Sequence, residues 1–260
     1  MHCRKVSVIA ILFLCLCSFS TAGKSEPIYH KKAYPAGSGP FPAVIALHTA
    51  GGLRHMGPLI QQFVDSGFAV YAPDMFKRHH ITGRTRGDAF GINSEEIGNE
   101  LLEIINLMKS DPKVDKNNIF SAGYSAGGFF VCFLAGKAVV NAGVSQYGVW
   151  QGKRRWDMGD NPAGYLSKSS TPILALHGKN DGTQKLYKVK FAWELVKDRG
   201  APLEIYVYPE ADHAWDRKDH PRHPYNEEVT KDSHKRTIEF FIKHMTNNVY
   251  SYEFFKKYMK

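Results

Sequence analysis

Residues 119–131 read IFSAGYSAGGFFV, and the predicted fold is built outward from this segment. An apolar run typical of a buried strand leads into Gly-Tyr-Ser-Ala-Gly, and helix-forming residues follow. A serine between two glycines at a strand-to-helix turn can be held on a tight bend, with its hydroxyl above the edge of the sheet. We expect a Cβ at Gly123 or Gly127 to collide with the opposite segment, because the strand and the returning helix are closest there. Ser125 is therefore the predicted nucleophile.

Short apolar runs alternate with helix-patterned stretches from Lys24 onward, as in a parallel sheet covered on both faces. We expect strands at residues 44–48, 68–74, 118–125, 142–148, 173–178 and 203–209, with a weaker entry strand near residues 28–34. The expected helices lie near residues 57–65, 94–109, 126–138, 185–198 and 227–244. The sequence has no internal repeat and no low-complexity linker. This order predicts the α/β-hydrolase fold, with a mostly parallel central sheet and one domain over residues 23–260.

Two polar side chains follow later strands of the predicted sheet. Asp181 lies in the turn after strand 173–178, and His213 comes shortly after strand 203–209. Sites in open α/β sheets form outside the carboxyl ends of the strands, so both side chains are expected near the serine. The chain order Ser, Asp, His is that of α/β-hydrolases. An imidazole takes the serine proton and a carboxylate fixes the imidazole tautomer, which makes His213 the predicted base and Asp181 its partner.

The roles predicted for Asp181 and His213 each have an alternative interpretation. Asp181 precedes Gly182 and has the composition of an ordinary turn residue. His220, His223 and His234 compete with His213 for the role of base. Spacing favours His213, because the other histidines lie farther into a polar loop or on the final helix.

Residues 1–22 have the organisation of a secretory signal. A basic segment at residues 2–5 precedes an apolar segment at 6–16 and a small-residue cleavage site, Ser-Thr-Ala, at 20–22. The apolar run is shorter than the roughly 20 residues that span a bilayer, so no stable membrane anchor is expected. The sequence predicts cleavage after Ala22 and a secreted or periplasmic protein; the alternative is an uncleaved membrane anchor.

Charge and cysteine content limit the possible partners. The chain has 34 basic and 25 acidic residues, and loss of Arg4 and Lys5 with the signal lowers its net charge from +9 to +7. Such a surplus of positive charge can attract an anionic substrate, but the basic residues are scattered, so nucleic-acid binding is not expected.

Cleavage of the signal would leave Cys132 as the single cysteine, unable to form a disulfide within the chain. Its apolar helix predicts a buried packing residue rather than a second nucleophile.

The tetrahedral intermediate of such a reaction needs preorganised donors for its oxyanion. One is expected to be the backbone N–H of Ala126, the residue after the nucleophile, and the other should come from the loop after strand 44–48. That loop has small residues, Thr49-Ala50-Gly51-Gly52, which allow main-chain amides to approach a substrate.

Five motifs together resemble the dienelactone hydrolase family of α/β-hydrolases, over roughly residues 43–244. They are HTAGGL at 48–53, APDMF at 72–76, GYSAGG at 123–128, HGKND at 177–181 and ADHAW at 211–215. The resemblance implies a compact esterase with a cavity over the strand ends and no cofactor. It also implies that the second oxyanion donor is Ala50.

Two departures from the family pattern bear on the substrate. Family members that open dienelactones carry a cysteine at the elbow and a glutamate after the loop histidine, where this sequence has Ser125 and Thr49. The sequence therefore predicts a serine carboxylesterase that cleaves a small or medium ester or lactone through an acyl-enzyme on Ser125. The alternatives are a serine peptidase or acyl-peptide hydrolase, and a noncatalytic hydrolase-fold binding protein. Nothing in the sequence indicates the oligomeric state.

Substrate-binding residues are predicted from position alone. Tyr124 and Trp215 lie near strand ends and are expected to wall the acyl pocket, unless they pack in the framework. Arg84 lies with Arg78 and Arg86 after the APDMF motif, where the family places a contact to a substrate carboxylate, although arginines in a polar loop are often only solvated.

The sequence offers few candidate metal ligands. Only Asp216, His220 and His223 approach the ligand spacing of a zinc site, so no metal is predicted.

The C-terminal tail, residues 247–260, alternates aromatic residues with lysines. We expect it to dock as a terminal helix; the alternative is contact with a membrane or partner.

Overall fold

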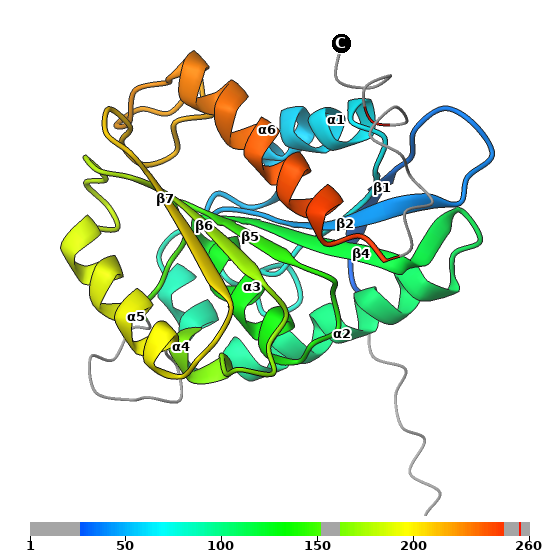
Figure 1. The fold of residues 1–260 in the computed structure, drawn as a ribbon, viewed down its shortest axis with the longest axis horizontal. Helices are drawn as coiled ribbons and strands as arrows, with labels where there is room; N and C mark the ends of the chain where they lie inside the picture. The colour runs from blue at the N-terminus through cyan, green and yellow to red at the C-terminus, as the bar shows by residue number, and fades with distance from the viewer. Residues whose placement is uncertain (1–26, 152–161, 247–254, 256–260) are drawn as a thin grey trace, which may run out of the picture.

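The computed structural model describes residues 27–151, 162–246 and 255 (Figure 1). Seven strands form one sheet in the order β1-β3-β2-β4-β5-β6-β7, and only β1 is antiparallel to its neighbour. The strands are β1 (His30–Ala33), β2 (Phe41–Leu47), β3 (Ala69–Pro73), β4 (Val114–Tyr124), β5 (Gly143–Gln146), β6 (Ile173–Gly178) and β7 (Leu203–Tyr208). The predicted α/β-hydrolase architecture is confirmed. The predicted leader, residues 1–22, lies outside the described residues.

The helices follow the predicted order. They are α1 (Gly57–Asp65), α2 (Ser94–Ser110), α3 (Ala126–Gly136), α4 (Pro162–Tyr165), α5 (Leu186–Asp198) and α6 (Glu227–Lys243). The short α4 and the 3₁₀ helices η1 (Leu53–His55) and η2 (Arg86–Phe90) were not predicted. The start of β4 was also predicted too late, because the polar residues 115–118 hide the strand; Val114 pairs with Phe41 before an irregularity in the register.

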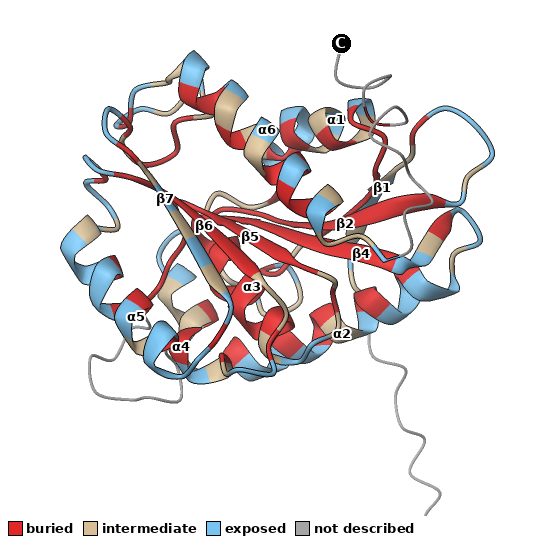
Figure 2. Ribbon diagram, viewed as in Figure 1, coloured by how far each residue is buried: buried red, intermediate tan, exposed pale blue. Residues whose placement is uncertain are grey.

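Helices cover both faces of the sheet. Figure 1 shows α1 and α6 on one side and α2 to α5 on the other. Figure 2 shows buried positions concentrated on the central strands and on the helix faces toward them. Alternate residues of β4 serve the two layers: Phe120 packs in the cluster of α1 and α6, whereas Ile119 packs in the cluster of α2, α3 and α5. The central strands are thus buried on both faces, as their near-continuous apolar sequences require.

Within the C-terminal tail, residues 247–260, the structure describes only Phe255. Phe255 is fully buried and stacks on Phe68 with ring centroids 5.3 Å apart. The rest of the predicted tail helix lies outside the described residues.

No helix in the described part of the chain combines the length and apolar character needed to cross a membrane. Strands β4, β6 and β7 are parallel members of one sheet, so the loops that follow them leave from the same edge. These loops carry the predicted serine, aspartate and histidine.

Candidate active site

Ser125 lies at the turn between β4 and α3 in a strained backbone conformation. Its φ is 50° and its ψ is −106°, and a positive φ is costly for a residue with a Cβ. The backbone around it holds this conformation. The Ser125 N–H donates to the Gln146 carbonyl at 3.0 Å, and the Ser125 carbonyl accepts from the N–H groups of Gly128 and Val149. Such strain is typical of a nucleophile elbow.

The two flanking glycines have the steric role that the sequence predicted. A Cβ on Gly123 would lie 2.3 Å from the Gly127 carbonyl oxygen, and a Cβ on Gly127 would lie 2.2 Å from the Leu47 carbonyl oxygen. Both distances are far below contact distance, and the atoms met are backbone atoms that cannot move aside. The elbow can therefore form only with glycine at both positions.

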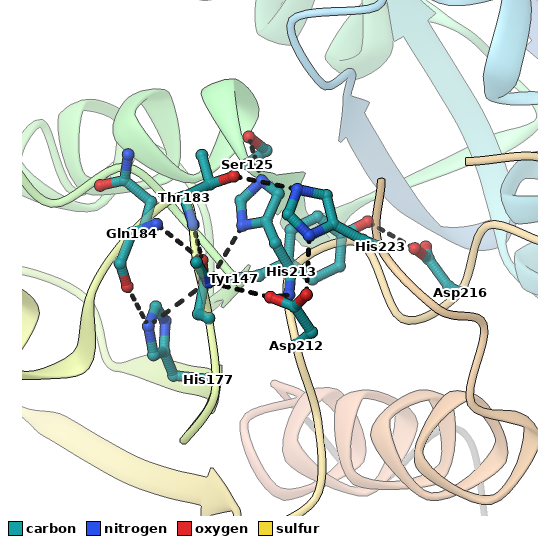
Figure 3. Close-up of polar contacts among 11 residues, drawn as sticks. Ser125, Tyr147, His177, Thr183, Gln184, Asp212, His213, Asp216 and His223 are labelled. Atoms are coloured by element: carbon teal, nitrogen blue, oxygen red, sulfur yellow. Dashed lines mark hydrogen bonds and ion pairs between the residues drawn. The ribbon is translucent and has the colours of Figure 1, made fainter. Parts of the chain in front are cut away.

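The structure brings Ser125, His213 and Asp181 together, and Figure 3 labels Ser125 and His213. His213 Nε2 lies 3.0 Å from Ser125 Oγ, and His213 Nδ1 lies 2.8 Å from Asp181 Oδ2. The carboxylate can only accept, so the ring donates its Nδ1–H to Asp181, and the neutral ring accepts the serine proton at Nε2. The three residues are 8%, 5% and 3% exposed, respectively. This arrangement can abstract a proton from Ser125.

Asp181 is held more firmly than an ordinary turn residue. Its Oδ1 accepts from the backbone N–H groups of Thr183 at 2.8 Å and Gln184 at 2.6 Å, which leaves Oδ2 for His213. Behind it, His177 donates its Nε2–H to the Gln184 carbonyl at 2.8 Å. Burial lowers the pKa of His177, although the Asp181 carboxylate acts in the opposite direction. A neutral His177 therefore supports the loop that carries Asp181.

The three other candidate bases have other partners. His223 Nδ1 lies 2.8 Å from Asp212, and His220 Nδ1 accepts from the backbone N–H groups of Arg222 and His223. Burial lowers the pKa of His220 to about 4, assisted by the nearby His223 and Arg217. His234 bonds to Ser66 at 2.8 Å, between α6 and α1. Among the described residues, His213 is the imidazole within hydrogen-bond distance of Ser125.

The loop after β2 carries Ala50 and is held by its own residues. The Thr49 carbonyl accepts from the Gly52 N–H at 3.0 Å and from His48 Nδ1 at 2.7 Å. Thr49 Oγ1 accepts from the Gly51 N–H at 3.1 Å, so this hydroxyl helps to shape its own loop. Ala126, the other predicted oxyanion donor, is the first residue of α3, where backbone N–H groups have no partner within the helix. His48, whose ring contacts the Thr49 carbonyl, was not among the predicted site residues, although its place at a strand end could have indicated it.

Two of the predicted substrate-binding side chains are core residues instead. Tyr124 is 1% exposed and Trp215 is fully buried. Tyr124 lies on the face of β4 that packs toward α1 and α6, and Trp215 packs against Tyr147 and Tyr208. These side chains have no surface left for a substrate, so their assignment to the acyl pocket was wrong.

The arginines after β3 differ in their surroundings. Arg78 pairs with Glu100 of α2 at 3.0 Å. Arg84 is exposed in the loop between β3 and η2, and its contact to substrate stays a prediction.

Tyr147 and Asp216 lie beside the site and were not predicted as a pair. Tyr147 donates to Asp216 Oδ1 at 2.7 Å, and its ring meets the His213 ring edge-on, with centroids 4.9 Å apart (Figure 3). Burial raises the pKa of Asp216, although the bond from Tyr147 acts against this. Tyr147 is fully buried with a φ of 38°, and nothing in the local sequence marks it. In the described part of the chain, no group of three or more His, Cys, Asp or Glu side chains is arranged to hold a metal ion, Asp216, His220 and His223 included.

Known proteins share this fold. A "Putative carboxymethylenebutenolidase" from Methylorubrum extorquens is 24% identical over 219 residues, which are 81% of this chain and 75% of the relative. The structure of a "Putative Dienelactone Hydrolase" from Klebsiella pneumoniae matches with a TM-score of 0.72 at 22% identity, covering 82% of this chain and 92% of its own. A thermophilic esterase from Thermogutta terrifontis matches with a TM-score of 0.60 at 14% identity, covering 87% and 96%. The sequence profile of the dienelactone hydrolase family matches residues 30–245, and the chain belongs to that family.

Proposed function

We propose that this protein is a serine hydrolase of the carboxylesterase type that cleaves a small or medium ester or lactone. The observation that carries the proposal is the hydrogen-bonded chain from Ser125 through His213 to Asp181, with Ser125 held at a strained elbow. Family members include hydrolases, and this chain has a serine at the elbow in place of the cysteine of the lactone-opening members. The proposed chemistry is therefore that of an activated serine.

The proposed reaction has two stages. Ser125 Oγ attacks the substrate carbonyl carbon while His213 Nε2 takes its proton, and Asp181 stabilises the imidazolium through the Nδ1–H bond. The bond to the alcohol oxygen then breaks as His213 returns the proton to that oxygen, and the acyl group stays on Ser125. Water next adds to the acyl carbon and gives its proton to His213. The proton returns to Ser125 Oγ as the acid leaves.

The backbone N–H groups of Ala126 and Ala50 are the proposed donors to the oxyanion in both stages. Their role fits their places, at the start of α3 and in the loop after β2. Fixed backbone donors stabilise the transition state strongly because they need no reorganisation during the reaction.

The test is an assay of the purified protein on p-nitrophenyl acetate and butyrate, beside p-nitroanilides of the same acids. We expect release of p-nitrophenol and none of p-nitroaniline, with loss of turnover in Ser125→Ala. Ser110→Ala, which changes an exposed serine on α2, serves as the control and should retain wild-type turnover. Amide cleavage would favour the peptidase alternative, and absence of turnover on every ester would favour the binding protein. Undiminished turnover in folded Ser125→Ala would exclude the serine mechanism.

A further inference from the structure

A hydrogen-bonded circuit joins the loop that carries Asp181 to the loop that carries His213 (Figure 3). Its centre is Asp212, the residue before the base. Asp212 Oδ1 accepts from the backbone N–H groups of Gly182 at 2.9 Å and His213 at 2.6 Å, and Oδ2 accepts from His223 Nδ1 at 2.8 Å. One carboxylate therefore binds three donors from three segments of the chain.

Thr183 closes the circuit. His223 donates its Nδ1–H to Asp212, and its Nε2 lies 3.0 Å from the Thr183 hydroxyl, so the two side chains hydrogen-bond. The backbone N–H of Thr183 donates to Asp181 Oδ1 at 2.8 Å. A path that starts at the bond between His213 and Asp181 thus returns to the backbone of His213 through hydrogen bonds alone.

Burial and a backbone hydrogen bond fix the position of His223 beside Asp212. It is 8% exposed, and its backbone N–H donates to His220 Nδ1 at 3.1 Å. Its ring lies against that of His213, with centroids 5.4 Å apart. Burial acts to raise the pKa of Asp212, but the bonds from His223 and from the backbone of Gly182 and His213 outweigh it and lower that pKa. At neutral pH, His223 thus faces an ionised acceptor.

We propose that Asp212 and His223 are positioning residues, which hold the two loops so that the His213 ring stays between Asp181 and Ser125. This inference rests on the proposed function. Both catalytic hydrogen bonds are made by one imidazole, so relative movement of the two loops lengthens at least one of them. Catalytic groups lose much of their effect when they are misplaced by about 1 Å. Neither Asp212 nor His223 touches the reacting atoms.

The experiment compares kcat, KM and the unfolding midpoint of four variants on the most active p-nitrophenyl ester. His223→Ala removes both side-chain bonds and should lower kcat by about tenfold or more, with KM changed by less than about twofold. His223→Asn retains a donor where Nδ1 lies and should recover part of this loss. Thr183→Val alters an exposed residue, removes only the hydroxyl, and should lower kcat by a smaller factor. His234→Gln, at a histidine bonded to Ser66 away from the site, is the matched control and should keep its kcat.

The outcomes separate positioning from simple loop stability. Wild-type kcat in folded His223→Ala, or in Thr183→Val if His223→Ala does not fold, would overturn the inference. So would a His223→Asn variant that is no more active than His223→Ala. Ser125→Ala is measured in parallel. If it loses turnover while the circuit variants keep theirs, only the positioning role fails; if it keeps turnover, the proposed function fails as well.

Discussion

His48 holds the carbonyl of Thr49, with 2.7 Å between its Nδ1 and the carbonyl oxygen. The Met75 backbone N–H lies 3.0 Å from the other ring nitrogen, closer than the Asp74 carboxylate at 3.7 Å. Nε2 is therefore an acceptor and Nδ1 carries the proton. In a trans peptide the N–H points opposite to the carbonyl, so His48 fixes the direction of the Ala50 N–H.

Replacing His48 should therefore impair the proposed oxyanion hole. We expect His48→Leu to lower kcat by about 10²-fold, as for loss of one oxyanion donor, with a smaller change in KM. The unpaired Met75 N–H should also cost about 1–3 kcal/mol of unfolding free energy. Steady-state kinetics and urea unfolding measure the two effects. His30, the first residue of β1, donates its Nδ1–H to the Ile28 carbonyl and provides the control, because His30→Leu should keep its kcat. An unchanged kcat in folded His48→Leu would show that the loop needs no such support.

Ser125 and His213 should behave as one unit. We expect Ser125→Ala and His213→Ala each to lower kcat by roughly 10⁴-fold or more, and the double variant to be little worse than either, because such residues are non-additive. Asp181→Asn should be damaging but milder, since it disturbs the imidazole without removing the nucleophile or the base. An organophosphonate, followed by mass spectrometry, should label Ser125 alone. Strictly multiplicative losses would contradict direct coupling through the 3.0 Å bond between them.

Cys132 should be inert. It is fully buried in α3, and burial raises the pKa of its thiol well above the ordinary value, which keeps it protonated. Iodoacetamide should leave the folded protein unmodified and label it after unfolding in urea. Cys132→Ala should keep ester turnover and lose roughly 1–2 kcal/mol of stability from the small cavity. Loss of turnover in a folded variant would instead give the thiol a role in the reaction.

His234 should make the protein less stable in acid. Burial lowers its pKa to about 4 in the folded state, against an ordinary value of 6.5. As the pH falls from about 6.5 to 4, the unfolded chain takes up the proton first, so stability is complete above this window and is lost within it. The loss from this one group is at most about 3 kcal/mol. Urea unfolding at pH 7 and pH 4 should show a smaller drop for His234→Gln than for the wild type. Equal losses of stability in the two proteins would mean that His234 takes up its proton as readily in the folded protein as in the unfolded chain.

We propose export of the chain with cleavage after Ala22, on the basis of the basic, apolar and small-residue segments within residues 1–22. Protein isolated from its native host should begin at Gly23, as read by Edman degradation or intact mass. Ala22→Tyr should block cleavage, because the site requires a small residue there. A mature N-terminus that retains Phe13 would contradict the proposal.

The order of strand, elbow and helix around Ser125 was predicted from local sequence, and the structure has this order. The elbow follows from a strand, two glycines and a helix in immediate succession, and the clash distances at Gly123 and Gly127 give the physical reason. Chain order and strand ends were enough to select Asp181 and His213, because parallel strands bring their carboxyl ends to one edge. Their hydrogen bonds in the structure agree with this selection.

Strand order and the residues next to strand ends can be read from the sequence, and they are enough to predict the fold and the three residues that meet. The surroundings of these residues depend on tertiary packing. Tyr124 is adjacent to Ser125 in the chain, yet it lies in the core, because alternate residues of β4 face opposite layers of helices. The hydrogen-bond partners of the His223 ring are 11 and 40 residues away in the chain, and no local pattern encodes such contacts. They arise where loops from different strands pack together, so their geometry is fixed only when the whole sheet has formed.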